Sequence, residues 1–111
     1  MSEIIVGPSS EEIAFSWGDA TPRIIQEMVT GLTINMIKLV IQTVFNGTGA
    51  TLSLGIIGTP ELFMATTENI PSVVGTYIVT PGYKFTSTNT VRLFITPGSA
   101  SSGNGVILIN F

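Results

Sequence analysis

Residues 47–58, GTGATLSLGIIG, form the stretch in which the spacing of glycines could serve phosphate binding. A P-loop has the pattern G-x-x-x-x-G-K-[ST], but this stretch contains no lysine. A dinucleotide-binding loop has the pattern G-x-G-x-x-G, yet Leu52 stands where the third glycine belongs. A strand pattern also follows where a helix should begin, so no helix N-terminus would face a phosphate. The glycines therefore indicate tight turns and close packing.

The seven acidic residues are the remaining candidates for chemistry, because the chain has no histidine and no cysteine. Those two absences remove the commonest general base and transition-metal ligand, and every disulfide. Glu11 and Glu12 are adjacent and would point to opposite faces of a strand, whereas a glycosidase needs two carboxylates across one bond. No D-x-D-x-D-G calcium loop occurs, which leaves only Asp19 or Glu68 with backbone carbonyls as an alternative. We predict no catalytic residue, no metal site and no cofactor, and we expect that the protein is not an enzyme.

The charge content is low. Charged residues make up 10% of the 111 residues and hydrophobic residues 44%, against a usual charged share of about 25%. The four cations, Arg23, Lys38, Lys84 and Arg92, are scattered, so no basic cluster exists to bind nucleic acid. A surface left to Thr, Ser, Asn and Gly is poorly protected against association. This composition favours a protein that works assembled with partners over a monomer with a neutral surface.

Membrane and secretory segments are not predicted. The most apolar stretch, residues 24–45, is interrupted by Gln26, Glu27, Asn35, Lys38 and Gln42, so it contains no continuous apolar span. The beginning, MSEIIVGPSSEE, is acidic and its apolar run is too short for a signal peptide.

Turn signals at short, even intervals predict an all-β protein. Pairs and triplets such as Gly7-Pro8, Asn46-Gly47 and Pro81-Gly82 separate runs rich in Val, Ile, Thr, Phe and Tyr. We predict strands over residues 13–17, 23–29, 33–45, 51–54, 75–79, 90–96 and 105–110, with an eighth at 4–6. The fold class is a jelly-roll-like antiparallel β-sandwich with one short helical crossover. Residues 1–111 form a single domain, in which 1–10 are an N-terminal arm.

Two segments have competing interpretations. Residues 33–45 fit either a helix or a long strand, and the abundance of Val, Ile and Thr favours the strand. Asn46-Gly47 then predicts a type I′ hairpin into 51–54. Residues 59–64, TPELFM, have the N-cap, proline and acid of a helix start, which predicts the helical crossover.

The last strand, GVILINF, is apolar on both faces, unlike TVRLFIT (90–96), in which Phe94 is the exception on an otherwise polar side. A strand that is apolar on both faces is covered on both faces. We therefore assign the assembly interface to the apolar residues of this strand: Val106, Ile107, Leu108, Ile109 and Phe111.

The stretch VFNGTGATLSLGIIGTPELFM, followed by VGTYIVTPGYKFTSTNTVRLFITPGSASSGNGVILINF, resembles a group of small tailed-bacteriophage virion proteins. The matching positions are 45–50, 51–55, 62–64, 75–77, 83–86 and 93–98, and 21–31 is similar to the family's opening strand. The resemblance implies a jelly-roll-like structural part of the particle: a capsid decoration or cement protein, a head fibre or a tail-fibre piece. It further implies a homotrimer that binds the major capsid protein or another virion protein. The location would be the virion, assembled in the host cytoplasm.

The alternative function is a glycan- or receptor-binding module of a head or tail fibre. Carbohydrate-binding modules use exposed aromatic side chains as stacking platforms. Tyr83 follows Pro81-Gly82 at the corner between a strand and a loop, and we predict glycan contacts at Tyr83, Thr86 and Asn89. Two Thr-Pro-Gly turns, at 80–82 and 96–98, predict that the loops after them lie at the same edge of the sandwich.

Overall fold

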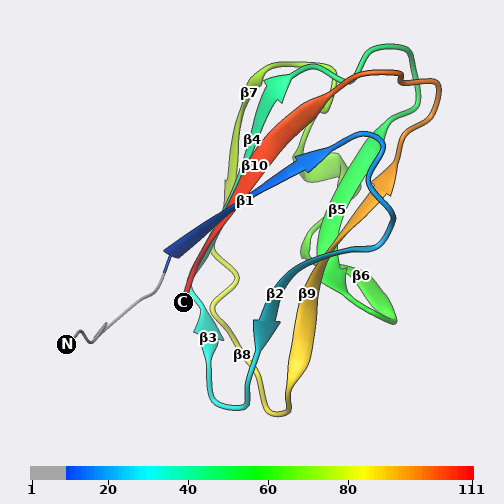
Figure 1. Cartoon of the computed structure of the whole chain (residues 1–111). Helices are drawn as coiled ribbons and strands as arrows, with labels where there is room; N and C mark the ends of the chain where they lie inside the picture. Colours follow the sequence, from blue (N-terminus) through cyan, green and yellow to red (C-terminus); the bar gives the residue numbers. More distant parts are fainter. Residues whose placement is uncertain (1–9) are drawn as a thin grey trace.

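Two four-stranded antiparallel sheets face each other in the computed structural model, which describes residues 10–111 (Figure 1). Sheet A contains, in spatial order, β1 (Ser10–Ser16), β10 (Asn104–Asn110), β4 (Met36–Thr43) and β7 (Gly75–Val79). Sheet B contains β2 (Arg23–Met28), β9 (Asn89–Thr96), β5 (Thr51–Ile56) and β6 (Thr59–Met64). A small third sheet pairs β3 (Thr33–Ile34) with β8 (Tyr83–Lys84).

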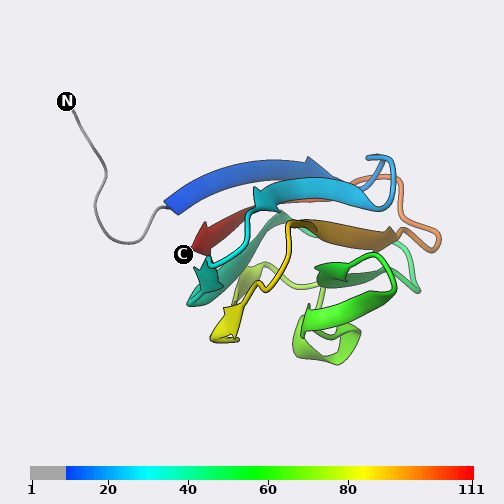
Figure 2. The ribbon, with the colours of Figure 1, turned by 90° about the horizontal axis from the view of Figure 1, so that it is seen from below.

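The strand pairs are nested along the chain. The first strand pairs with the last, β2 with β9, β3 with β8, β4 with β7, and β5 with β6. The chain is therefore one long antiparallel ribbon, folded back at the β5–β6 turn. Rolling the ribbon brings β10 beside β4 and β9 beside β5, which closes the two layers seen in Figure 2. This arrangement is a jelly roll, and it confirms the predicted fold class.

The core lies between the two sheets and is built by alternation. Inward positions of β4 (Ile37, Leu39 and Ile41) and of β9 (Val91, Leu93 and Ile95) are buried, while their neighbours along each strand are not. Burial of each such side chain stabilises the fold by about 1.5–3 kcal/mol. The other buried hydrophobic residues are Phe15, Ile25, Met28, Ile34, Phe45, Leu52, Leu54, Phe63, Met64, Phe85, Ala100, Ile107 and Ile109.

All seven main predicted strands are present, with boundaries shifted by a few residues. The long strand predicted over 33–45 is divided into β3 and β4 at Asn35, whose backbone N–H donates to the Asn110 carbonyl at 2.8 Å. The eighth predicted strand, at 4–6, lies outside the described residues. Within residues 10–111 no helix is long and apolar enough to span a membrane.

The helical crossover predicted at 59–64 is wrong, because these residues form strand β6. Phe63 and Met64 are buried in the core, and Met64 pairs with Leu54 of β5. This burial outweighs the local helix-start signals, as tertiary packing often does. A 3-10 turn, η1 (Thr66–Glu68), follows instead, and the Glu68 carboxylate accepts the Ala65 N–H at 2.7 Å.

The hairpin predicted at Asn46-Gly47 is also wrong. A type I′ turn needs positive φ at both central residues, but only Gly47 has it, with φ 75°. Strand β4 belongs to sheet A and β5 to sheet B, so the segment between them crosses from one layer to the other. Alternation before and after an Asn-Gly pair does not distinguish such a crossing from a hairpin.

Hydrogen bonds attach this crossing segment to the loop at 97–103. The Asn46 side-chain carbonyl accepts the N–H groups of Ser101 and Ser102 at 2.6 and 3.0 Å. The Thr48 N–H donates to the Ser99 hydroxyl at 2.8 Å, and the Ser99 N–H donates to the Thr48 carbonyl at 3.0 Å. The polar residues of both loops therefore hold one end of the sandwich together.

The two Thr-Pro-Gly turns lie at opposite ends of the sandwich, so the prediction of a shared edge is wrong. Strand β7 ends at Val79, which pairs with Ile37 near the beginning of β4. The loop that follows β9 instead contacts Asn46, which lies beyond the end of β4. The similarity of the two turns is local turn chemistry.

Candidate functional site

Several acidic side chains in the described part of the chain are engaged with the backbone around them, and Glu61 and Glu68 accept the neighbouring Thr66 and Ala65 N–H groups. Within residues 10–111 no group of three acidic side chains could hold a metal ion. Asp19 accepts the Ser16 N–H at 2.8 Å and pairs with Arg23 at 2.7 Å, so it fixes the turn between β1 and β2. Glu68 is engaged at the start of η1.

The residues predicted for the assembly interface are divided between two environments by the alternation of β10. Ile107 and Ile109 point inward and are 0% and 1% exposed, so they belong to the protein's own core. Phe111 is partly buried and packs against that core. Val106 and Leu108 point to the outer face of sheet A, where they are half-buried. An interface on this strand would therefore involve Val106 and Leu108.

Aliphatic side chains on neighbouring strands extend this outer face. Strand register places Val106 beside Val40, and Leu108 between Lys38 and Glu12. Lys38 is in turn beside Ile78, which is 57% exposed on the edge strand β7. We call the apolar members the outer patch: Met36, Val40, Ile78, Val106 and Leu108. They form an apolar surface on sheet A that is interrupted by Lys38, between Leu108 and Ile78, and bordered by Glu12.

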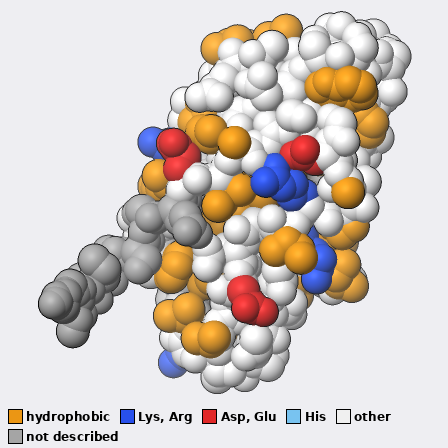
Figure 3. Space-filling view, viewed as in Figure 1, with side chains coloured by type: hydrophobic (Ala, Val, Ile, Leu, Met, Phe, Trp, Pro, Cys, Tyr) orange, Lys and Arg blue, Asp and Glu red, His pale blue; other side chains and the backbone are white. Residues whose placement is uncertain are grey.

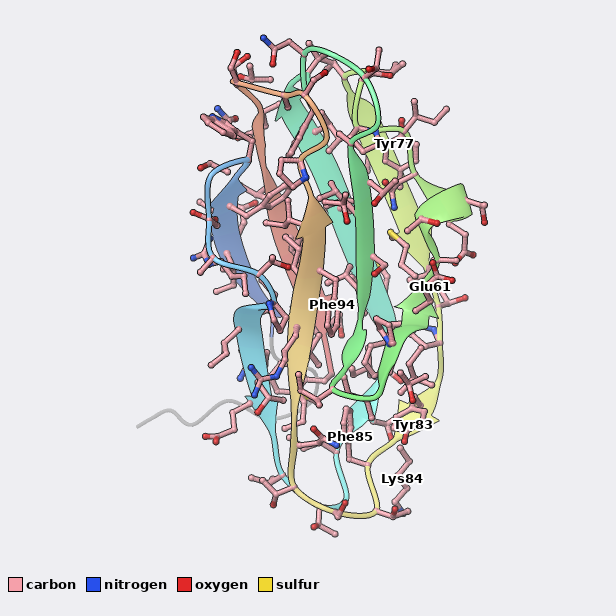
Figure 4. All side chains as sticks on the ribbon, turned by 90° about the vertical axis from the view of Figure 1, so that its right-hand side faces the viewer. Glu61, Tyr77, Tyr83, Lys84, Phe85 and Phe94 are labelled. Carbon is pink, nitrogen blue, oxygen red and sulfur yellow. The ribbon has the colours of Figure 1, made fainter. Side chains whose placement is uncertain are left out.

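The predicted glycan contacts lie in different local environments. The Tyr83 ring lies edge-to-face against Phe63 and Phe85, with centroid distances of 5.4 and 5.0 Å. It therefore packs beside the core at the lower end of the sandwich in Figure 4. Asn89 uses its side-chain carbonyl to accept the Thr90 N–H at 2.8 Å, and Thr86 is exposed on the loop before β9.

A groove of about 550 Å³ lies on the outer face of sheet B. Its floor is made by β5 and β9, where Ser53 is paired with Phe94 and Thr51 with Thr96. Ser53 is 4% exposed although it faces outward, and Phe94 is half-buried. Figure 4 shows Phe94 on β9 and Glu61 on the β6 side of β5. The groove is lined by Thr51, Ser53, Gly58, Thr59, Pro60, Glu61, Thr66, Phe94 and Thr96.

Strand β6 forms the wall of the groove because it is bulged. Its two pairs with β5, Leu54–Met64 and Ile56–Thr59, lie two positions apart on β5 and five apart on β6. The chain at 59–60 lies directly over Gly55, where a Cβ atom would be 2.2 Å from the Thr59 carbonyl oxygen. A glycine at this position is therefore required for the wall to approach the sheet.

Sequence reasoning missed this groove, although one signal for it was present. Phe94 interrupts the polar side of TVRLFIT, and an aromatic residue at an outward position indicates that something covers or uses it. The positions of Glu61 and Thr66 could not be inferred, because they depend on the β6 strand that was predicted as a helix.

Charged side chains are sparse on the molecular surface. On the face drawn in Figure 3, a few blue and red groups lie between larger uncharged areas, and hydrophobic side chains gather in several separate groups. The exposed large hydrophobic residues include Ile24, Ile57, Val74 and Ile78.

No protein-family model matches the chain, and no curated protein sequence matches it either. Two solved structures contain chains of similar fold. One is the acidic stable capsid structure of Helicobacter pylori bacteriophage KHP30, with a TM-score of 0.77 and 12% identity over 96% of this chain and 88% of that chain. The other is the capsid asymmetric unit of cyanophage Pam1, with a TM-score of 0.72 and 12% identity over 99% of this chain and 90% of that chain. At this identity the likeness establishes the jelly-roll fold, and it covers nearly the entire chain.

Proposed function

We propose that the chain is a structural protein of a bacteriophage capsid, located in the virion after assembly in the host cytoplasm. The support is the nearly full-length similarity of fold to chains in two phage capsid structures. Jelly rolls serve many functions, so the role of the chain must also be inferred from its surface. A low charge content and the lack of a metal-holding acidic cluster in residues 10–111 are consistent with a structural role.

The specific role we propose is decoration or cementing of the head shell as an oligomer, a homotrimer in the simplest case. The observation that carries this role is the outer patch on sheet A. In the strand register Val106 of the last strand pairs with Val40 of β4, and Lys38 of β4 lies between Leu108 and Ile78 of β7. Apolar side chains that lie together across neighbouring strands gain free energy when another surface covers them.

We assign the outer patch to the contact between copies within the oligomer. The patch follows the outer surface of a sheet, and a second sheet or loop of the same kind could cover it. Homo-oligomeric interfaces are also more apolar than the rest of a protein surface. Contacts with the major capsid protein would then be made by other surfaces of the assembled oligomer.

The test is a Leu108→Asp variant, examined by light scattering after size exclusion. We expect the wild-type protein to have the mass of a trimer and to sediment with head shells that lack it. The aspartate would be an uncompensated charge in a buried contact, so we expect monomers that no longer sediment with shells. Ile24→Asp is the matched control, because Ile24 is an exposed aliphatic residue on the outer face of sheet B.

Two results would contradict the proposal. One is a Leu108→Asp protein that keeps the mass and shell binding of the wild type. The other is a wild-type protein that is monomeric and does not bind shells.

A further inference from the structure

We infer that the groove on the outer face of sheet B is a binding site for a neutral saccharide. This inference concerns a different surface from the outer patch and holds whether or not the chain is a capsid protein. Its volume, about 550 Å³, is within the range of about 300–1,000 Å³ typical of small-molecule sites.

The floor of the groove provides an aromatic platform. Phe94 and Ser53 are directly opposite each other on β9 and β5, so their side chains lie on the same face of the sheet. Phe94 is half-buried, with its ring bordering the groove. The C–H face of a pyranose ring is apolar and flat, and an aromatic ring of this kind is the partner on which it stacks.

Hydroxyl groups surround this platform. Ser53 is 4% exposed and lines the groove. A hydroxyl group both donates and accepts hydrogen bonds, which matches the hydroxyl groups of a sugar. Four threonines add hydroxyl groups around the floor and the wall: Thr51, Thr59, Thr66 and Thr96.

Glu61 supplies the one charged acceptor. Its Oε2 atom accepts the Thr66 N–H at 3.2 Å, which holds the carboxylate at the wall of the groove. Its Oε1 atom accepts no hydrogen bond from the described residues. Hydrogen bonds from a neutral hydroxyl to a carboxylate are stronger than those between neutral groups, so Oε1 would bind a sugar hydroxyl.

The charge of the groove determines the class of saccharide. No lysine or arginine lines it, and Arg92, on the same face of β9 as Phe94, lies outside the lining, so the groove itself offers no cation to a phosphate, a sulfate or an acidic sugar near Glu61. A single carboxylate among many hydroxyl groups also differs from a cation site, which gathers several charged oxygens. Neutral hexoses and N-acetylhexosamines combine an apolar face with several hydroxyl donors, and they fit this lining.

The experiment is saturation-transfer-difference NMR with the full-length protein and the methyl glycosides of glucose, mannose, galactose and N-acetylglucosamine. We expect transfer to at least one of the four sugars, strongest at the protons of the face that stacks on Phe94. Phe94→Ala should weaken that binding about tenfold or more, because it removes the platform. Ile24→Ala, on the same face of sheet B but outside the groove, should bind as the wild type does.

A second variant keeps the test decisive if Phe94→Ala does not fold. Glu61 is exposed, so Glu61→Gln preserves the shape of the wall while it removes the charged acceptor, and we expect several-fold weaker binding. The inference is overturned if no sugar of the panel receives saturation, or if the folded variants bind as tightly as the wild type. It is also overturned if N-acetyl-lysine methylamide receives saturation and the four sugars do not.

Discussion

The outer faces of sheets A and B differ in chemistry, although both sheets contribute the same kind of aliphatic side chains to the core. On sheet A the outward positions of β4 and β10 include the apolar Met36, Val40, Val106 and Leu108 together with Lys38, Gln42 and Asn110. On sheet B the outward positions of β5 and β9 include Thr51, Ser53, Phe94 and Thr96, with Arg92 opposite Gly55 at the next pair. The first face carries apolar side chains around Lys38, whereas the second contains a groove lined with hydroxyl groups.

The two faces suit two different kinds of partner, which the overall composition of the chain does not distinguish. An apolar face gains free energy only when a large surface covers it, which suits a contact between protein chains. A groove with an aromatic floor and a few hydrogen-bonding groups suits a small ligand instead. The same sandwich can therefore assemble through one sheet and bind through the other.

The largest expected effect distinguishes the inner from the outer face within a single strand. Ile107→Ala should lower the free energy of unfolding by about 2–5 kcal/mol, because Ile107 is fully buried and the variant leaves a cavity. Leu108→Ala should change the stability of the monomer by less than about 1 kcal/mol, since its side chain is outside the core. Urea unfolding of both variants at concentrations that keep the chains monomeric checks this. Equal losses for the two variants would contradict the assignment of faces in β10.

An intermediate effect on stability is expected at Gly55, over which the wall of the sheet B groove lies. Gly55→Ala should cost about 1–3 kcal/mol, because its Cβ atom would displace the chain at 59–60. The displacement should also reduce sugar binding, since Thr59, Pro60 and Glu61 line the groove. Thermal unfolding measures the cost, and Gly18→Ala, where nothing lies within 4 Å, is the control. A Gly55→Ala protein that is as stable as Gly18→Ala would show that the wall is not held against the sheet.

The smallest effect compares two exposed isoleucines on opposite faces. Ile78→Ser on sheet A should weaken the oligomer about tenfold, because it removes part of the outer patch from the contact. Ile24→Ser on sheet B should leave the mass of the oligomer unchanged and alter stability by about 0.5 kcal/mol or less. Analytical ultracentrifugation over a range of concentrations measures both. If Ile24→Ser also weakened the oligomer, the contact would not be confined to sheet A.

Local patterns in the sequence identified most of the strands, but they misassigned β6 as a helix and did not give the strand pairing. Alternation in β4 and β9 identifies the inward residues, including Ile37, Leu39 and Val91, and the structure confirms them. The nested pairing joins Ser10 to Asn110, and such distant contacts have no local signal. The turn at Asn46-Gly47 was misinterpreted for this reason, because a crossing between sheets and a hairpin share the same local residues.

The candidate sites were predictable to different degrees. The apolar character of the last strand indicated a covered outer face, but only the structure shows that Ile107 and Ile109 are in the core and that Val106 and Leu108 are outside it. Removal of the last strand would therefore unfold the protein before it could test assembly. Tyr83 was selected as an aromatic residue at a corner, yet contacts with Phe63 and Phe85 place it beside the core.

A map of the assembled particle, detailed enough to place each chain, tests the central claim most directly. The account predicts that the chain lies on the head shell and that the outer patch is covered by a neighbouring copy of the same chain. The groove on sheet B is predicted to remain open to solvent. A map in which the outer face of sheet A is exposed to solvent, or in which the chain does not occur in the head, would contradict the account.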